Sequence, residues 1–342
     1  MNTRAFITGV SGLELTATER EFIRAERPWG FILFKRNVDA PEQVIRLLRD
    51  LRDTVGEPDA PVLIDQEGGQ VQRLRPPNWP LYPAGAAFGD LYDIDPALGI
   101  SAARLSARLI AADLSDLGVT VDCLPLADVP VPGADAVIGD RAYGAEPKKV
   151  AAIARAVTDG LEHGGVLPVL KHIPGHGRAT ADSHLKLPTV DTPKNELERT
   201  DFAAFRPLAD LPMAMTAHVV FSALDPAHPA TTSATIIEQV IRGVIGFQGL
   251  LMSDDVGMNA LAGSFAERTR AVFAAGCDVV LHCSGKLDEM REIAAETPEL
   301  SGKALERARQ ALASRRPPQP FDRVAARAEL DALISRVGTA GA

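Results

Sequence analysis

Short runs of apolar, strand-favouring residues recur along this chain, and segments with a helical pattern separate them. Each run is about as long as a buried strand and alternates little with polar residues, which is typical of a parallel sheet covered on both faces. The runs cover residues 5–10, 30–34, 61–65, 119–124, 166–172, 212–218, 249–254 and 277–282. The pattern therefore predicts eight buried strands.

The segments between these runs predict helices. Residues 41–54 carry four apolar residues at i, i+3, i+4 and i+7, from Val44 to Leu51, which form one apolar stripe. Asp39 is the expected N-cap, and Pro41 suits the first turn. Further helical patterns cover residues 97–117, 147–163, 194–207, 234–245 and 265–275, and later ones lie near 286–296, 301–314 and 323–337.

Strand and helix alternate eight times, which favours a (β/α)8 barrel of the TIM type over an open doubly wound sheet. The open sheet stays the alternative, although no GxGxxG motif follows the first strand. We expect residues 1–342 to form a single α/β barrel domain, with closing helices at about 286–337. The long connections 66–97, 124–146 and 172–193 follow strands, so they belong to the face where barrel enzymes carry their active sites.

The composition excludes several classes of protein. Hydrophobic residues make up 46% and charged residues 24%, which suits a soluble globular protein with a large core. A net charge of −9 and the absence of a Lys/Arg run argue against nucleic-acid binding. Three cysteines without a CxxC motif, and no long apolar segment, predict a cytoplasmic protein that does not enter a membrane.

Ionisable side chains stand at the ends of five predicted strands, and in a barrel these ends share one face. They are Asp65 with Glu67, Lys171 with His172, His218, Asp254 with Asp255, and His282. One such residue is usually a satisfied structural group, but five strands that end this way indicate a catalytic site.

Residues 171–188 form the third long loop, in which Gly175 and Gly177 call for permissive backbone. The loop presents Asp182-x-His184, and an Asp so placed can orient a histidine ring and raise its basicity for acid–base catalysis. The alternative for this motif taken by itself is an Asx-turn beside a surface histidine.

Asp254 and Asp255 are adjacent on a strand, so their side chains point to opposite faces. A carboxylate at a strand end, with a proton donor on a facing loop, is an arrangement for glycosyl transfer. A zinc site built from histidines competes with this interpretation. We favour the metal-free one because Pro174 interrupts the HxxxH at 172–176 and the first strand carries no HxH pair.

Four segments resemble the signature motifs of glycoside hydrolase family 3, in particular its bacterial N-acetyl-β-glucosaminidase (β-N-acetylhexosaminidase) branch of peptidoglycan recycling. They are DQEGGQVQR at 65–73, IGDRAY at 138–143, KHIPGHG at 171–177 with ADSH at 181–184, and SDDVGM at 253–258. Their order and strand placement match the family as well.

The resemblance implies a retaining exo-glycosidase that releases terminal β-linked N-acetylglucosamine from muropeptide or anhydro-disaccharide fragments. It implies that Asp254 is the nucleophile and His184 the general acid/base, with Asp182 as its partner. The residues expected to hold the sugar are Asp65, Arg73, Arg141, Lys171 and His172.

No cofactor and no metal is expected, and the predicted partner is a small glycan, bound by a monomer. A glycoside phosphorylase on the same site, a β-glucosidase of the same family and a non-catalytic sugar-binding barrel stay open as alternatives.

Overall fold

Eight parallel strands form the wall of a barrel in the computed structural model of this chain, which describes residues 3–179, 181, 183 and 186–339. The strands are β1 (Arg4–Thr8), β2 (Pro28–Leu33), β3 (Val62–Ile64), β6 (Val121–Asp122), β7 with β8 (Leu167–Pro168 and Leu170–Ile173), β10 (Met213–Thr216), β12 (Leu250–Asp255) and β13 (Val279–His282). The pairing order is β7-β6-β3-β2-β1-β13-β12-β10-β8. Since a single residue, Val169, separates β7 from β8, the ring closes, and the predicted barrel is confirmed.

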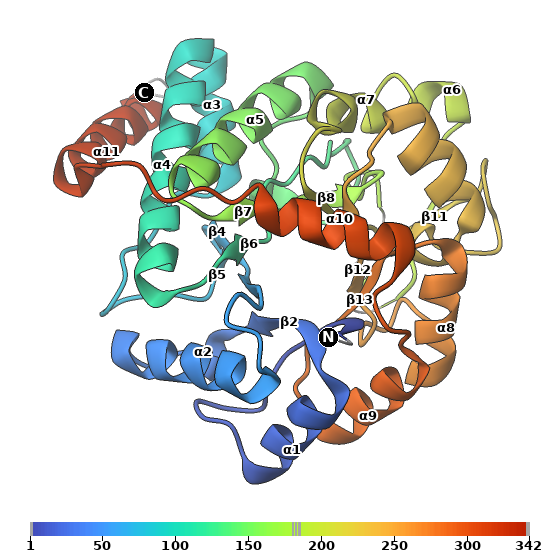
Figure 1. Cartoon of the computed structure of the whole chain (residues 1–342). Helices are drawn as coiled ribbons and strands as arrows, with labels where there is room; N and C mark the ends of the chain where they lie inside the picture. The colour runs from blue at the N-terminus through green and yellow to red at the C-terminus, as the bar shows by residue number, and fades with distance from the viewer. Residues whose placement is uncertain (1–2, 180, 182, 184–185, 340–342) are drawn as a thin grey trace.

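Helices surround the strands as an outer layer (Figure 1). The longer ones are α1 (Ala17–Glu26), α2 (Pro41–Val55), α3 (Gly85–Ile94), α4 (Pro96–Leu117), α5 (Pro147–His163), the π-helix η5 (Ile236–Ile245), α8 (Phe265–Ala275), α9 (Leu287–Glu296), α10 (Gly302–Ala313) and α11 (Arg323–Thr339). Shorter turns are η1 (Lys35–Asn37), η2 (Gly139–Arg141), α6 (Lys194–Leu197), α7 (Asp201–Phe205), η3 (Arg206–Leu208) and η4 (Ala230–Thr232). Among the described residues, no helix is both long and apolar enough to span a membrane.

The strands separate two layers of core, because successive side chains point to opposite faces of a strand. On β1, Ile7 packs inside the barrel, whereas Phe6 packs outward under the helices. On β12, Met252 points inward and Leu251 outward. This alternation determines which residues at the strand ends face the barrel mouth.

Helix α10 covers the end of the barrel at which the strands begin. Ala308 and Ala311 of α10 join the inner core, and the backbone before the helix pairs with β1 through Arg4 and Glu299. In Figure 1, α10 lies across the middle of the ring of strands. With this end covered, a substrate has access from the opposite, C-terminal mouth.

Several local predictions were wrong. Ala40, not Asp39, precedes α2 as its N-cap, and no side chain caps this end. The predicted helix 194–207 is broken at Thr200, whose hydroxyl bonds to the carbonyl of Glu196 and to the Asp201 carboxylate. Helix α1 was not predicted, although Thr16 and Glu19 form a capping box.

Small elements line the C-terminal mouth. The predicted connection 66–97 contains helix α3 and a hairpin of β4 (Gln66–Gly68) and β5 (Val71–Gln72). Gly68 allows this hairpin, since it has φ 96° and a Cβ there would lie 2.2 Å from the Pro83 carbonyl oxygen. A second pair joins β9 (Thr189–Val190) to β11 (Val220–Phe221). These elements form the rim of the site.

Candidate active site

One hollow at the C-terminal mouth brings together six of the eight predicted site residues. It holds about 750 Å³ of empty space, a volume that includes open solvent at its mouth. Six predicted residues line it: Asp65, Arg73, Arg141, Lys171, His172 and Asp254. Asp182 and His184, the other two, lie outside the described residues.

Strand alternation turns these side chains into the mouth. Leu63 points into the barrel core, so Asp65, two residues later, continues on the same inner face. Met252 and Asp254 are related in the same way on β12, as are Val169 and Lys171, the second residue of β8. The apolar floor of the hollow thus gives way to charged groups where each strand ends.

Five charged side chains form a continuous chain of ion pairs. Arg73 Nη2 donates to Asp65 at 2.9 Å, and Lys171 Nζ donates to the other Asp65 oxygen at 3.1 Å. Lys171 also contacts Glu67 at 2.5 Å. Arg141 then binds Glu67 with two hydrogen bonds, of 2.9 and 2.8 Å. Three cations thus share two carboxylates, so this network by itself has one surplus positive charge, while the acidic side chains of Asp254 and Asp255 also line the hollow.

This network keeps its members ionised. Burial by itself would raise the pKa of Asp65, but Lys171 and Arg73 hold it far below its usual value. Burial opposes ionisation of Glu67 as well, yet Lys171 and Arg141 lower its pKa to about 2. Burial would lower the pKa of Lys171, and the two carboxylates raise it instead. The site therefore presents fixed charges at neutral pH.

Asp128, on the connection after β6, organises two histidines. It is fully buried, and its Oδ2 lies 2.7 Å from His172 Nδ1. Its Oδ1 accepts a 2.6 Å hydrogen bond from the backbone N–H of His176. The segment 171–177 packs closely here, since a Cβ on Gly177 would lie 2.2 Å from the carbonyl oxygen of Val129. The predicted permissive backbone is confirmed at Gly175, which has φ 141°, whereas Gly177 is needed for this close approach.

Ser183, which lies between Asp182 and His184 in the sequence, makes hydrogen bonds with His176 and Ala260. Its Oγ lies 3.0 Å from His176 Nε2, and its carbonyl accepts a hydrogen bond from the Ala260 N–H at 3.2 Å. Burial lowers the pKa of His176 to about 4, so its ring is neutral at pH 7. These contacts join two parts of the third long loop and connect it to the loop after β12.

The two adjacent aspartates on β12 have different surroundings. Asp254 Oδ1 accepts the backbone N–H of Asp255 at 2.8 Å. Asp255 Oδ1 accepts two backbone N–H groups, from Gly257 at 2.9 Å and from Cys283 at 3.1 Å. Burial raises the pKa of Asp255. The bond from Gly257 shapes the turn that follows β12, and the bond from Cys283 ties Asp255 to the segment after β13. Asp254 continues the inward-facing row, but Asp255 lines the hollow as well, at an irregularity in the pairing of β12 with β13.

Two histidines predicted at the strand ends, His218 and His282, make hydrogen bonds inside the fold instead of facing the hollow. His218 is fully buried and bridges Thr231 Oγ1 at 2.7 Å and the carbonyl oxygen of Asp255 at 3.0 Å. His282 is also buried, and its Nε2 lies 3.0 Å from the Glu289 carboxylate. Neither ring lines the hollow.

Comparison with known proteins establishes the family. Residues 7–314 match the family described as "Glycosyl hydrolase family 3 N terminal domain". A curated β-hexosaminidase from Alkalilimnicola ehrlichii is 40% identical over 280 residues, which are 81% of this chain and 79% of that protein. This chain belongs to glycosyl hydrolase family 3.

Solved structures agree with this assignment. NagZ from Neisseria gonorrhoeae, in complex with N-trifluoroacetyl-D-glucosamine, superposes with a TM-score of 0.83 at 31% identity and is covered to 98%, as is this chain. A family 3 β-N-acetylglucosaminidase from Paenibacillus gives 0.82 at 29% identity, over 97% of this chain and 66% of that one. The family predicted from the motifs is confirmed, and this chain is a glycoside hydrolase.

Sequence reasoning did not assign roles to two carboxylates of this family 3 hydrolase. Glu67 follows a strand, but its bidentate partner Arg141 lies 74 residues away in the sequence. Asp128 is 44 residues from His172 and belongs to none of the motifs. The available signal was the position of Asp128 just after a buried strand, at the start of a long connection.

Proposed function

We propose that this chain is a retaining exo-β-N-acetylhexosaminidase that releases terminal, non-reducing β-linked N-acetylglucosamine. The observation that carries the proposal is the Asp254 carboxylate at the barrel mouth, in the same hollow as the ion-pair network. The names of the relatives support it, as does the N-acylated glucosamine with which the Neisseria protein forms its complex.

The proposed chemistry has two displacements. Asp254 attacks the anomeric carbon and forms a glycosyl ester, while the bond from that carbon to the leaving oxygen breaks. His184 gives its proton to that oxygen. His184 then takes a proton from water as the water oxygen attacks the same carbon, and Asp254 leaves as a carboxylate. Asp182 is proposed to orient His184 and to stabilise its protonated form.

The remaining predicted residues are proposed to hold the sugar. Arg73, Arg141 and Lys171 offer charged hydrogen-bond donors to hydroxyl and acetamide oxygens, and Asp65 offers an acceptor. Because the ion pairs fix these groups before substrate arrives, little conformational entropy is lost when the sugar binds.

The proposed natural substrates are muropeptide or anhydro-disaccharide fragments of the cell wall, cleaved in the cytoplasm by a single-domain monomer. These finer statements rest on the resemblance to the peptidoglycan-recycling branch of family 3. A β-glucosidase of the same family is the alternative within hydrolysis.

A phosphorylase is the second candidate, and two features favour it. The ion-pair network, counted without Asp254 and Asp255, has one surplus positive charge, and the proposed acid is a histidine instead of a carboxylate. Both features reduce the repulsion that phosphate would meet at the site.

The deciding experiment is an assay with aryl β-glycosides of N-acetylglucosamine, glucose and N-acetylgalactosamine, with and without phosphate. We expect N-acetylglucosamine as the product at a rate independent of phosphate. Sugar 1-phosphate detected by ³¹P NMR would instead identify a phosphorylase. Preferred cleavage of the glucoside would contradict the N-acetyl specificity, and Asp254→Ala serves as the inactive control.

A further inference from the structure

The aromatic ring of Phe34 lies in the hollow beside the ion-pair network. Ile32 of β2 points into the barrel core, so Phe34, two residues later, continues on the same inner face. The guanidinium of Arg73 lies over the Phe34 ring, with its central carbon Cζ 5.1 Å from the ring centroid. This distance is inside the limit of roughly 6 Å at which a cation is attracted to the electron-rich face of a ring.

Hydrogen bonds by themselves restrain the Arg73 guanidinium only in part. Nη2 donates to Asp65 at 2.9 Å. Nε is buried, and it has no hydrogen-bond partner among the residues that the structure describes. The guanidinium is a rigid planar fork, and a single hydrogen bond leaves such a fork free to rotate about that bond. The face of the Phe34 ring supplies the second contact, which restricts this rotation.

Phe34 is itself fixed to the barrel wall. The guanidinium of Arg36 also lies over its ring, 5.0 Å from the centroid. Arg36 Nε donates to the carbonyl oxygen of Val10 at 2.9 Å, and Nη2 donates to that of Cys283. A Cβ on Gly9 would lie 2.6 Å from the Cys283 carbonyl oxygen, so glycine leaves room for this contact. The ring therefore offers Arg73 a fixed surface.

We propose that Phe34 is a positioning residue, whose ring face holds the Arg73 guanidinium in place to donate to the sugar. The inference rests on the proposed function, because Arg73 is one of the residues proposed to hold the sugar. An arginine that is restrained before the substrate arrives loses less conformational freedom when the substrate binds, so the contact should lower KM. The value of kcat should change little, since a donor that holds the sugar equally in the ground and transition states affects KM alone.

Fluorination of the ring tests this contact with little change in packing. Fluorine withdraws electrons from the ring and so weakens its attraction for a cation. In full-length enzymes with mono-, di- and trifluorinated phenylalanine at position 34, we expect KM for an aryl N-acetylglucosaminide to rise stepwise, by about tenfold at the trifluorinated ring. A KM that does not respond to fluorine would overturn the proposal.

The matched control for the fluorine series is Phe247. Its ring also lies under a guanidinium, that of Arg242, at 5.4 Å. Arg242 binds the carbonyl oxygen of Gly249, just before β12 begins, so this pair lies at the opposite end of the barrel from the hollow. The same fluorinated residues at position 247 should leave KM unchanged. A rise as large as that at position 34 would show that fluorine acts through the fold, and it would overturn the role of Phe34.

A second variant separates a contact with Arg73 from direct stacking of the sugar on Phe34, because fluorine would weaken both. In Arg73→Met the cation is gone, so kcat/KM should no longer depend on the fluorine content of residue 34. If fluorine lowers kcat/KM in Arg73→Met as strongly as in the unmodified enzyme, the ring acts on the sugar itself and the proposal is overturned.

Nitrogen NMR tests the contact without any substrate. In the full-length protein labelled with ¹⁵N-arginine, the Arg73 Nε–H proton should resonate upfield, because the guanidinium lies over the ring face, and its signal should disappear in Arg73→Lys. Phe34→Leu should move this signal downfield, whereas Phe247→Leu should not. A signal that is unchanged in Phe34→Leu would overturn the contact. If the unmodified enzyme cleaved no glycoside, the proposed function would fail while the NMR result still stood.

Discussion

At the scale of single residues, the two aspartates at the end of β12 differ in what their oxygens already bind. Both side chains line the hollow, but Asp255 Oδ1 accepts two backbone N–H groups, from Gly257 in its own turn and from Cys283 after β13, whereas Asp254 Oδ1 accepts that of Asp255 and continues the inward row of Met252. Asp254→Ala should therefore reduce kcat by several orders of magnitude because covalent catalysis is lost. Peptide mapping after inactivation by a 5-fluoro glycoside should find the label on Asp254, and label on Asp255 would contradict the assignment.

The proposed acid/base leads to a prediction about leaving groups. His184→Ala should be slow on aryl glycosides with poor leaving groups, which need a proton, and should lose far less on a dinitrophenolate. Asp182→Asn should have a milder effect and shift the pH optimum. The measurement is a plot of rate against leaving-group pKa. Equal slowing on every substrate would show that His184 is not the acid.

Glu67 should contribute to stability and to its dependence on pH. Its pKa lies near 2, below the unfolded value of 4.5, so its stabilisation is complete above about pH 4.5 and is lost as the pH falls towards 2. Glu67→Gln leaves Lys171 and Arg141 short of a partner and should lower the free energy of unfolding by about 3–5 kcal/mol at pH 7.

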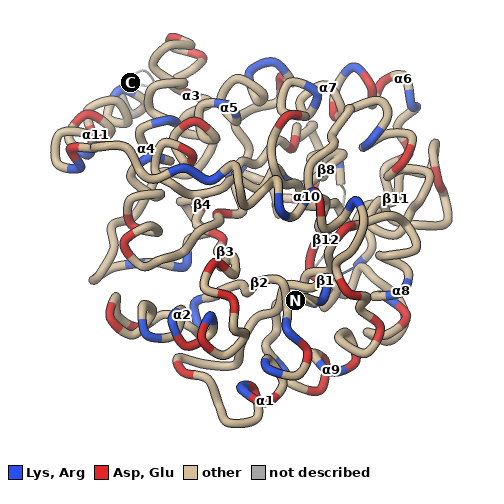
Figure 2. Tube along the Cα trace, viewed as in Figure 1, with Lys and Arg blue, Asp and Glu red and all other residues tan. Residues whose placement is uncertain are grey.

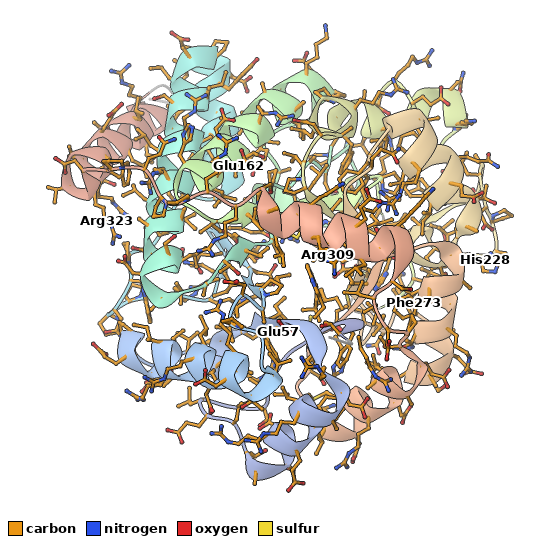
Figure 3. The ribbon with its side chains drawn as sticks, in the orientation of Figure 1. Glu57, Glu162, His228, Phe273, Arg309 and Arg323 are labelled. Atoms are coloured by element: carbon orange, nitrogen blue, oxygen red, sulfur yellow. The ribbon has the colours of Figure 1, made fainter. Side chains whose placement is uncertain are left out.

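Urea unfolding at several pH values checks the prediction for Glu67. The matched control is Glu57→Gln, which removes a partly exposed ion pair with Arg27 and should cost about 0–1 kcal/mol. Glu57 is labelled in Figure 3, near the middle of the view. Equal losses of stability in the two variants would contradict a special role for Glu67. The role would also be contradicted if Glu67→Gln lost as much stability below pH 4.5 as the unmodified protein does.

At the scale of elements, the hydrophobic pattern predicted the barrel because each strand is buried on both faces, whatever its neighbours. Helices 147–163 and 265–275 were predicted with the observed bounds. The second begins after the capping box of Ser264 and Glu267 and ends before Gly276. The pattern failed where side chains compete with the helix, as Thr200 does between α6 and α7. It also predicted an ordinary helix where η5 is a π-helix.

The part of the site that lies at strand ends could be predicted, because the ends of all barrel strands meet at one mouth. Asp65, Lys171, His172 and Asp254 could be grouped because each follows an identifiable strand. The pairing of Glu67 with Arg141 could not be predicted, because it depends on how the β4–β5 hairpin and η2 fold over the mouth. Such partners come from loops, where sequence pattern carries the least information.

Helix α10 should tolerate little added volume where it meets the barrel. Ala311 is buried against the inner core, so Ala311→Phe should overpack it and lower the free energy of unfolding by about 1–3 kcal/mol. Ala313→Phe, at an exposed position of the same helix, is the matched control. Because α10 lies at the end opposite the hollow, KM should not change in either variant. Equal stability of the two variants would contradict the covering role of α10.

At the scale of the whole molecule, charge is distributed differently outside and inside. Acidic and basic residues are interspersed over the outer helices in Figure 2, and the chain as a whole carries a net charge of −9. The mouth of the barrel instead concentrates Arg73, Arg141 and Lys171 around two carboxylates. Binding should therefore depend on these local pairs more than on the overall charge.

The histidines, like the charges, are better understood from their individual contacts than from their number. His172 binds Asp128, His176 binds Ser183, and His218 bridges Thr231 and a backbone carbonyl. His228 lies at the outer edge of the molecule in Figure 3. In the part of the chain that the structure describes, no three His, Cys, Asp or Glu side chains are grouped as metal ligands.

Because these rings are engaged with separate protein partners, we predict catalysis by carboxylate and imidazole groups without a metal. The rate on an aryl N-acetylglucosaminide should survive exhaustive treatment with EDTA, followed by dialysis into metal-free buffer. Adding zinc back should not raise the rate of the treated enzyme. Intrinsic fluorescence measured in parallel would separate loss of a metal from loss of fold. A rate that falls on chelation with the fold intact, and that zinc restores, would sink the metal-free mechanism and require ligands that include residues 180–185.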